Sequence, residues 1–234
     1  MIVIPMAGQS SRFYNSGYTK PKYELQIRGK SVFSHVVESF KDYFDDEKFL
    51  FIINKKFDSR SFVEENLKKM NLSSYEIVEL DRDTLGQAET VYKGIEYIDD
   101  AEELYIFNID TFLTSFSKFN VDCDGYLEVF HDELGDNWSF AKVDLDNNVL
   151  EVAEKSRISN LCSNGLYYFK TMSLYREVFE YYQSNNIKSV NEYYIAPMYN
   201  YLINNKLNIK VRIVSRDNVI MCGTPEEYES LSSN

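Results

Sequence analysis

Residues that could bind a phosphate group and stabilise its transfer lie close together near the start of the chain. A loop of small residues follows a short apolar run: Ala7, Gly8, Gln9, Ser10 and Ser11. Small side chains let successive backbone N–H groups approach an anion closely. Two cations come next, Arg12 and Lys22, and fixed cations stabilise negative charge while a phosphate group is transferred. The segment therefore predicts a polyphosphate site in which the loop binds a nucleotide and Arg12 and Lys22 are catalytic candidates.

Only Gly8 in this loop is a glycine, so two common phosphate-binding motifs are absent. The segment matches neither G-x-x-x-x-G-K-[ST] nor G-x-G-x-x-G. A Gly/Ser turn beside solvated cations explains the loop equally well when it is taken alone. The spacing of Arg12 and Lys22 after an expected buried strand, residues 2–6, favours the phosphate site.

Gly86 and Gln87 form a second candidate nucleotide-binding segment, just before a helical pattern. Gly86 allows close backbone approach, and the Gln87 amide can both donate to and accept from the edge of a nucleobase. The same two residues would also suit an ordinary loop end and a solvated first turn. Their order after the phosphate loop favours nucleotide binding.

Asp110 is the candidate metal ligand. It ends an apolar run, residues 104–110, and therefore belongs to the carboxyl edge of a buried strand, where open α/β sheets bind ligands. Mg²⁺ prefers one or two carboxylates together with phosphate oxygens and water. An aspartate in this position can also be a plain turn residue, so the assignment depends on the neighbouring phosphate loop.

The elements expected in the first half of the chain alternate between strand and helix. We expect strands at residues 2–6, 49–54, 75–80 and 104–110, with helices at 31–44, 61–70 and from 87 to about 98. Ser61 and Glu64 fit a capping box at the start of the second helix. This alternation predicts an α/β fold with a doubly wound, mostly parallel, Rossmann-like central sheet.

The second half begins with strands in succession. We expect them at 125–131, 139–144, 149–153 and 161–169, followed by helices at 171–182 and 195–202 and a strand at 207–214. No low-complexity linker or internal repeat divides the chain. We therefore expect one domain, residues 1–234, with a nucleotide-binding half (1–122) and an acceptor-binding half (123–234) that adds a mixed β-sheet.

The ordered residues Gly8, Arg12, Pro21 and Lys22 resemble the opening signature of nucleotidyltransferases of the nucleoside-diphosphate-sugar pyrophosphorylase type. Ser10 stands where a second glycine is common in that family. The resemblance continues through Gly86 and Gln87, at the place where the family reads the nucleobase, and covers nearly the whole chain. It is nearest to the capsule-associated cytidylyltransferases. It implies that a nucleoside triphosphate and a phosphorylated acceptor give an activated product and pyrophosphate.

The resemblance also implies a set of acceptor-binding residues in the second half of the chain. They are Trp138, Ser139, Glu154, Lys155, Asn164, Gly165 and Glu192. In the family the Glu–Lys pair contacts the acceptor, and the lysine neutralises the acceptor phosphate. A Glu–Lys pair on a strand is by itself more often solvated surface, and Trp138 would also suit the core.

The segment from Gly223 to Glu227 predicts a helix start. Thr224 suits the N-cap, Pro225 the first helical position, and Glu227 completes a capping box. The segment resembles the family's closing motif with one departure. Many members carry a second metal-binding aspartate two residues before the glycine, whereas this chain has Met221 and then Cys222. The resemblance therefore implies Mg²⁺ on Asp110 and on phosphates, with a second protein carboxylate in doubt.

Composition excludes several classes of partner. The 234 residues carry a formal net charge of −12, which argues against nucleic acid and anionic membranes as main partners. The three cysteines lack C-x-x-C spacing, and the N-terminus has no signal-peptide pattern, so we expect a cytoplasmic protein. Aromatic residues make up 15%, and some could form a homo-oligomer interface.

We expect a cytidylyltransferase that joins CTP to a phosphorylated polyol, sugar or amino acid for capsule or surface polysaccharide synthesis. The preference for CTP comes from the resemblance alone, because Gln87 could equally pair with uracil or thymine. A UTP- or dTTP-dependent sugar-1-phosphate nucleotidyltransferase is the first alternative. Two alternatives belong to other classes. One is a glycosyltransferase, in which residues 108–110 would stand in for an Asp-x-Asp motif; the other is a non-catalytic nucleotide sensor.

Overall fold

Nine strands join into a single sheet that runs through both halves of the chain. The computed structural model describes residues 1–233. The nine strands are β1 (Ile2–Pro5), β4 (Phe49–Asn54), β5 (Tyr75–Leu80), β6 (Leu104–Phe107), β8 (Gly125–His131), β9 (Ser139–Val143), β10 (Val149–Glu154), β11 (Leu161–Phe169) and β12 (Ile209–Ile213). Two small antiparallel pairs lie beside this sheet. They are β2 (Gln26–Ile27) with β3 (Lys30–Ser31), and β7 (Thr111–Leu113) with β13 (Val219–Met221).

The first half of the chain supplies four parallel strands in the order β5-β4-β1-β6. Val3 of β1 is in register with Leu50 of β4 on one side and with Ile106 of β6 on the other. Strands β1, β4 and β6 are short, apolar and buried on both faces, as parallel strands covered by helices require, whereas the edge strand β5 is partly exposed. The expected α/β fold with a doubly wound parallel core is confirmed.

The later strands extend this same sheet and do not form a separate one. Strand β11 lies antiparallel to β6, with Tyr167 opposite Ile106, and also pairs with β8 and β9. Strand β12 pairs with β8 in parallel, so this part of the sheet is mixed as expected. The pairing of β11 with β8 shifts register between Ser163 and Tyr167. At this bulge Gly165 O accepts from Asn108 N, which directly follows the carboxyl end of β6.

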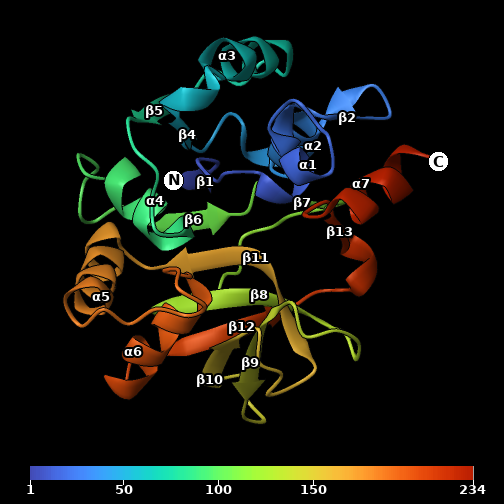
Figure 1. Cartoon of the computed structure of the whole chain (residues 1–234). Helices are drawn as coiled ribbons and strands as arrows, with labels where there is room; N and C mark the ends of the chain where they lie inside the picture. The colour runs from blue at the N-terminus through green and yellow to red at the C-terminus, as the bar shows by residue number, and fades with distance from the viewer. Residues whose placement is uncertain (234) are drawn as a thin grey trace.

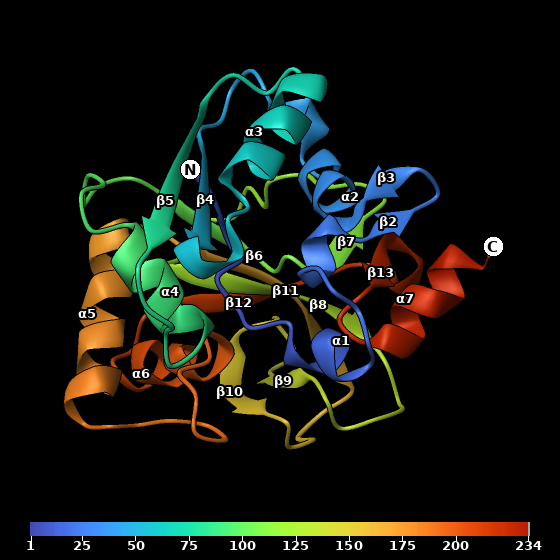
Figure 2. The same cartoon turned by 45° about the horizontal axis from the view of Figure 1, so that its top comes forward.

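Helices cover both faces of the sheet (Figure 1 and Figure 2). Ile2 and Ile4 pack in one apolar core with α2 and α3, whereas Val3 packs in a second core with α4, α5 and α6. The helices are α1 (Ser11–Asn15), α2 (Val32–Glu38), α3 (Arg60–Lys69), α4 (Gln87–Gly94), α5 (Met172–Ser184), α6 (Tyr199–Asn204) and α7 (Pro225–Ser232). Helix α7 lies beside β2, so the last helix of the chain packs on a segment from its first thirty residues (Figure 1). Within residues 1–233, no helix is long and apolar enough to cross a membrane.

Two helix starts show how far local sequence decides the structure. Helix α7 has the expected capping box, in which the Thr224 hydroxyl accepts from Glu227 N and the Glu227 carboxylate accepts from Thr224 N. The expected box at Ser61 is wrong, because α3 begins one residue earlier with Ser59 at its N-cap. The Ser59 hydroxyl donates to Glu24 Oε1 at 2.7 Å and does not cap the helix.

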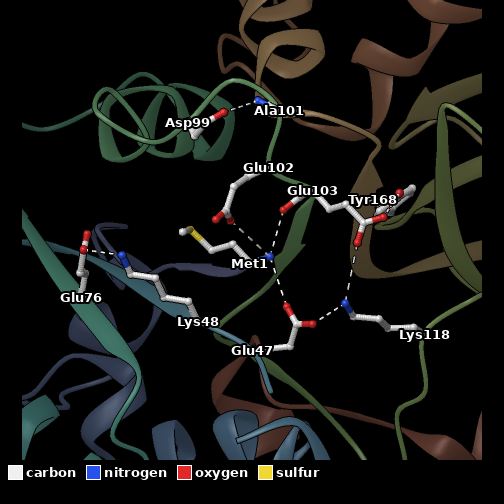
Figure 3. A network of polar contacts seen from close by, with 10 residues as sticks. All are labelled: Met1, Glu47, Lys48, Glu76, Asp99, Ala101, Glu102, Glu103, Lys118 and Tyr168. Atoms are coloured by element: carbon white, nitrogen blue, oxygen red, sulfur yellow. Dashed lines mark hydrogen bonds and ion pairs between the residues drawn. The ribbon is translucent and has the colours of Figure 1, made fainter. Parts of the chain in front are cut away.

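A network of charges lies at the amino ends of the parallel strands, on the edge of the sheet away from the carboxyl ends (Figure 3). Glu47 pairs with the amino group of Met1 at 3.3 Å and also with Lys118. The Met1 amino group donates to the Glu103 carbonyl at 3.0 Å. Burial raises the pKa of Glu47, but the hydrogen bond from Lys118 and the Met1 charge outweigh it, so the pKa is lowered. These charges neutralise one another and hold β1, β4 and β6 in place.

Candidate active site

A cleft of about 980 Å³ lies across the carboxyl ends of β1 and β6 and reaches the bulge of β11. Every site residue expected from the sequence borders it, with the exception of Lys155. Segments that are far apart in the sequence therefore meet in one place, at the edge where open α/β sheets bind ligands.

The phosphate-loop candidates, residues 7–11, turn sharply from β1 into α1. Ser10 takes a left-handed conformation with φ of 50°. Its carbonyl accepts from Phe13 N and Tyr14 N at 3.0 and 3.1 Å, and its hydroxyl accepts from Lys22 N at 3.2 Å. The serine that replaces a common glycine thus links the loop to the residue expected to be catalytic. Arg12 lies exposed on α1 and borders the cleft.

Lys22 and Asp110 meet in the centre of the cleft. The Lys22 ammonium lies 2.5 Å from Asp110 Oδ2, and both side chains are partly exposed. Asp110 was expected at the end of a strand, but β6 ends at Phe107 and Asp110 lies in the turn that leads into β7. Its carbonyl accepts from Cys222 N at 2.8 Å, so the C-terminal segment fixes this turn. The two residues given separate roles therefore form an ion pair.

The donor groups around Asp110 suit a hard cation shared with phosphates. No group of three or more His, Cys, Asp or Glu side chains with metal-binding geometry occurs in residues 1–233. The Met221 sulfur accepts from the Thr111 hydroxyl at 3.4 Å. Burial, together with the Asp110 charge, raises the pKa of Cys222 to about 12, which keeps this thiol neutral. One carboxylate completed by phosphate oxygens and water is an arrangement that Mg²⁺ accepts.

Gly223 leaves room beside this carboxylate. A Cβ at this position would lie 3.2 Å from Asp110 Oδ2 and 3.6 Å from Glu227 Oε2. Glu227 borders the cleft, yet its Oε2 accepts from Gly223 N at 2.7 Å and from Thr224 N at 3.1 Å. The second carboxylate near Asp110, that of Glu227, thus caps a helix. The capping-box pattern in the sequence did not indicate that Glu227 also borders the cleft.

The loop before α4 is clamped by a segment from the far end of the chain. Gly86 has φ of 126°, and a Cβ there would lie 2.6 Å from Tyr193 O and 2.7 Å from Tyr193 N. Tyr193 N donates to Leu85 O at 2.7 Å, and Ala88 N donates to Tyr193 O at 3.0 Å. Only glycine fits this position, because both the backbone conformation and the close approach exclude a side chain.

Gln87 is oriented by a residue that sequence reasoning passed over as a binding residue. Its Nε2 donates to Asn108 Oδ1 at 2.5 Å. Asn108 N in turn donates to Gly165 O at 3.2 Å, and a Cβ on Gly165 would lie 2.3 Å from Asn108 Nδ2. Asn108 therefore joins the base-reading candidate to the bulge of β11. Its position two residues before Asp110 was the available signal.

Trp138, Ser139, Glu154 and Glu192 border the other part of the cleft. The Ser139 hydroxyl donates to the Glu154 carboxylate across the β9–β10 pair. Burial raises the pKa of Glu154, and nearby Glu192 adds to this effect, while Ser139 and Lys155 oppose it. Trp138 packs edge-on against Phe130 with ring centres 5.6 Å apart, so one face of the cleft is held rigid.

Two of the expected acceptor residues have their polar groups engaged elsewhere. Lys155 has φ of 53°, and its ammonium donates to the Tyr194 hydroxyl at 2.7 Å, so it does not border the cleft. Asn164 borders the cleft, but its Nδ2 donates to buried Glu128 at 2.8 Å and its Oδ1 accepts from Leu166 N at 3.0 Å. The Asn164 side chain shapes the bulge, and Tyr194 is the cleft residue that stands in front of Lys155.

Negative charge dominates the border of the cleft. Arg12 and Lys22 are its cationic side chains within the described residues, and the carboxylates are Asp110, Asp132, Glu154, Glu192 and Glu227. Both cations lie on the phosphate-loop side. An anionic substrate would therefore be attracted to that side first, and a divalent cation would offset the remaining repulsion.

Solved structures place this architecture in a known family, although neither the protein-family models nor the curated proteins give a match. A nucleoside-diphosphate-sugar pyrophosphorylase from Vibrio cholerae RC9 is 43% identical, with 100% of both chains covered and a TM-score of 0.95. An inositol-1-phosphate CTP transferase from T. maritima shares the fold at 15% identity, with 99% of this chain and 94% of that chain covered and a TM-score of 0.78. A Bacillus anthracis protein assigned as a glucose-1-phosphate thymidylyltransferase shares it at 16% identity, with 99% and 93% covered and a TM-score of 0.77.

The relative from Vibrio cholerae carries the assignment, because its identity extends over the whole length of both chains. The two more distant structures show the fold alone. None of the three supports a glycosyltransferase or a non-catalytic sensor. The chain is an enzyme that belongs to the nucleotidyltransferase family of the nucleoside-diphosphate-sugar pyrophosphorylases.

Proposed function

We propose that this enzyme transfers a cytidylyl group from CTP to a phosphorylated polyol, sugar or amino acid and releases pyrophosphate. Its product would feed capsule or surface polysaccharide synthesis in the cytoplasm. The observation that carries the reaction type is the meeting of Arg12, Lys22 and Asp110 beside the phosphate loop in one cleft. The choice of CTP follows the resemblance to capsule-associated cytidylyltransferases.

The phosphate-loop side is proposed to hold the triphosphate. Arg12 and the amides of residues 7–11 would bind the leaving pyrophosphate. They would stabilise the negative charge that develops on it during the reaction. Lys22 would bridge the α-phosphate and the acceptor phosphate. Its ammonium has three donors, of which Asp110 takes one, so the ion pair need not be lost completely when a nucleotide binds.

Asp110 is proposed to hold Mg²⁺ together with the α- and β-phosphates. When bound, the ion would neutralise the phosphate charge that the acidic cleft otherwise repels. Asp110 suits this role because Lys22 and the Cys222 backbone hold its turn in place before any ligand arrives.

In the proposed reaction an oxygen of the acceptor phosphate attacks the α-phosphorus of CTP in line. The new P–O bond forms as the bond between the α-phosphorus and the bridging oxygen breaks, and pyrophosphate departs with that electron pair. No side chain becomes covalently attached. Positioning and stabilisation of charge supply the acceleration.

The acceptor is proposed to lie between Trp138, Glu154, Glu192 and the Gly165 bulge. Glu154 and Glu192 would accept from its hydroxyl or amino groups. Lys155 would reach the acceptor phosphate only by leaving Tyr194. Gly86 and Gln87 would hold the base, with Asn108 fixing the Gln87 amide. We propose that residues 1–122 and 123–234 act as one domain, since Tyr193 and Gly223 from the second half complete the first.

A thermal-shift panel of CTP, UTP, dTTP, ATP and GTP, each with and without Mg²⁺, tests the donor. A ligand at about 100 times its Kd stabilises the folded protein by about 2.7 kcal/mol, which raises Tm measurably. We expect a Mg²⁺-dependent shift with CTP. A shift with UTP or dTTP alone would move the proposal to the sugar-1-phosphate alternative. A shift with a nucleoside-diphosphate sugar and with no triphosphate would contradict nucleotidyl transfer.

A further inference from the structure

Lys56 lies just outside the cleft, between the two segments proposed to bind the nucleotide. It follows strand β4 in a short 3₁₀ turn, η3 (Lys55–Phe57). Its ammonium donates to Gln9 Oε1 of the phosphate loop and to Asp83 Oδ1 at 2.8 Å. Asp83 immediately precedes the segment 84–87 that leads into α4. One side chain therefore contacts both loops, which also meet through a hydrogen bond between Gln9 and Asp83.

Buried Asn54, at the end of β4, anchors this bridge. Its Nδ2 donates to Asp83 Oδ1 at 2.7 Å, and its Oδ1 accepts from Lys56 N at 3.1 Å. Hydrogen bonds from Lys56, Gln9 and Asn54 hold the pKa of Asp83 below its usual value. The Lys56–Asp83 pair is thus anchored to the sheet through Asn54.

The neighbouring ion pair shows what an ordinary surface pair looks like on the same turn. Lys55 pairs with Asp81 at 3.1 Å, and these side chains are 68% and 77% exposed. The corresponding values for Lys56 and Asp83 are 39% and 57%. Within residues 1–233, Lys55 contacts neither of the two segments proposed to bind the nucleotide. Lys55 is therefore a matched control for Lys56.

We propose that Lys56 is a positioning residue that locks the phosphate loop and the base-reading loop into one nucleotide-binding unit through Gln9 and Asp83. This inference rests on the proposed binding of a nucleoside triphosphate in the cleft. Lys56 itself does not border the cleft. Two loops held in register before binding lose less conformational freedom when the nucleotide arrives, so preorganisation strengthens binding.

The test measures the Kd of CTP with Mg²⁺ by calorimetry, together with kcat and KM, for matched variants. Lys56→Met should weaken CTP binding about tenfold and raise the KM for CTP by a similar factor, while kcat stays within about twofold; tenfold corresponds to about 1.4 kcal/mol. Lys55→Met should leave all three values unchanged. Lys56→Arg should retain most of the binding, because a guanidinium can bridge the same two oxygens.

The double variant Lys56→Met with Asp83→Asn separates positioning from simple charge. Its net charge equals that of the wild type, so an effect through space would be restored in it. A positioning role predicts that CTP binding stays weak and that the two substitutions together cost no more than Lys56→Met alone.

Normal CTP binding by Lys56→Met, equal loss in Lys55→Met, or recovery in the double variant would each overturn the inference. Failure of the wild type to bind any of the five triphosphates would overturn the proposed function and this inference together. Binding by the wild type with no effect of Lys56→Met would overturn this inference alone.

Discussion

The two sides of the cleft are built in different ways. The nucleotide side, formed by residues 7–12, 84–87 and 108–110, is made of backbone turns locked by close contacts, such as Gly86 against Tyr193. The proposed acceptor side, formed by Trp138, Ser139, Glu154, Glu192 and the Gly165 bulge, presents carboxylates and aromatic rings from the β9–β10 pair, from β11 and from the loops that contain Trp138 and Glu192. On the proposed function, the backbone turns would bind the triphosphate that is common to every reaction, and the side chains would discriminate among acceptors.

This difference predicts that substitutions on the two sides of the cleft affect the reaction in different ways. Changes on the nucleotide side should impair the reaction with every acceptor, because all acceptors need the same triphosphate geometry. Changes on the acceptor side should affect one acceptor more than another.

Lys22→Met should lower turnover by roughly 100- to 1,000-fold, as loss of one donor to a developing oxyanion does. The fold should persist, because Lys22 and its partner Asp110 are both partly exposed. Lys20→Met is the matched control, since Lys20 is an exposed lysine that does not border the cleft. Turnover near the wild-type value in Lys22→Met, with every acceptor tried, would remove this residue from the reaction.

Gly86→Ala should lower kcat/KM for the triphosphate by about 100-fold, because the new Cβ must push Tyr193 and shift the loop by a fraction of an ångström or more. The loss should be the same for all acceptors. Gly17→Ala provides the control: Gly17 has φ of 90°, yet a Cβ there meets nothing within 4 Å. If both variants lose the same activity, backbone strain rather than the Tyr193 clamp explains the effect.

Glu154→Gln should raise the KM for the acceptor roughly tenfold, the value of one hydrogen bond to a charged group, and leave the KM for CTP unchanged. Acceptors that differ in their hydroxyl or amino groups should be affected unequally. An equal rise in both KM values would contradict the division of the cleft.

The same variant should also be more stable than the wild type at neutral pH. The pKa of Glu154 is raised above its ordinary value of 4.5 in the folded state, chiefly by burial, so ionising it costs stability at a pH above the folded pKa. This cost disappears as the pH falls below the ordinary value. Thermal unfolding should therefore show a higher Tm for Glu154→Gln at pH 7.5, with the gap closing near pH 4. A gap independent of pH would assign the gain to packing.

Lys118→Met should leave both KM values unchanged while lowering the free energy of unfolding by about 1–3 kcal/mol, since it strips a charged hydrogen bond from partly buried Glu47. The pKa of Glu47 is lowered in the folded state, so its stabilisation is present above its unfolded pKa and lost as the pH falls through the folded pKa. Urea unfolding should show a difference from the wild type at pH 7 that shrinks near pH 3. An altered KM would show that this region reaches the cleft.

Sequence reasoning succeeded where short-range rules decide the outcome. The apolar run at β4 and the alternating pattern at β5 predicted the bounds of these strands correctly, and the Thr224–Glu227 capping box forms as expected. Gly8, Lys22 and Gly86 border one cleft, because parallel strands bring their carboxyl ends together; their roles in binding and catalysis stay predictions.

The rest depends on contacts between distant segments, which local rules do not contain. The Ser59 hydroxyl donates to Glu24 and therefore does not cap α3. Asn164 turns to Glu128, and Lys155 turns to Tyr194, because partners 36 and 39 residues away in the chain happen to lie beside them. The pairing of β7 with β13, which fixes the turn of Asp110, joins residues about a hundred positions apart and left no periodic signal.

The most direct test of nucleotidyl transfer is ³¹P NMR of CTP and Mg²⁺ incubated with the enzyme and a panel of phosphorylated polyols, sugars and amino acids. The account predicts that one acceptor produces pyrophosphate and a cytidine diphosphate diester in equal amounts, with Lys22→Met showing neither. Release of CDP or of inorganic phosphate, or pyrophosphate formed undiminished by Lys22→Met, would contradict it.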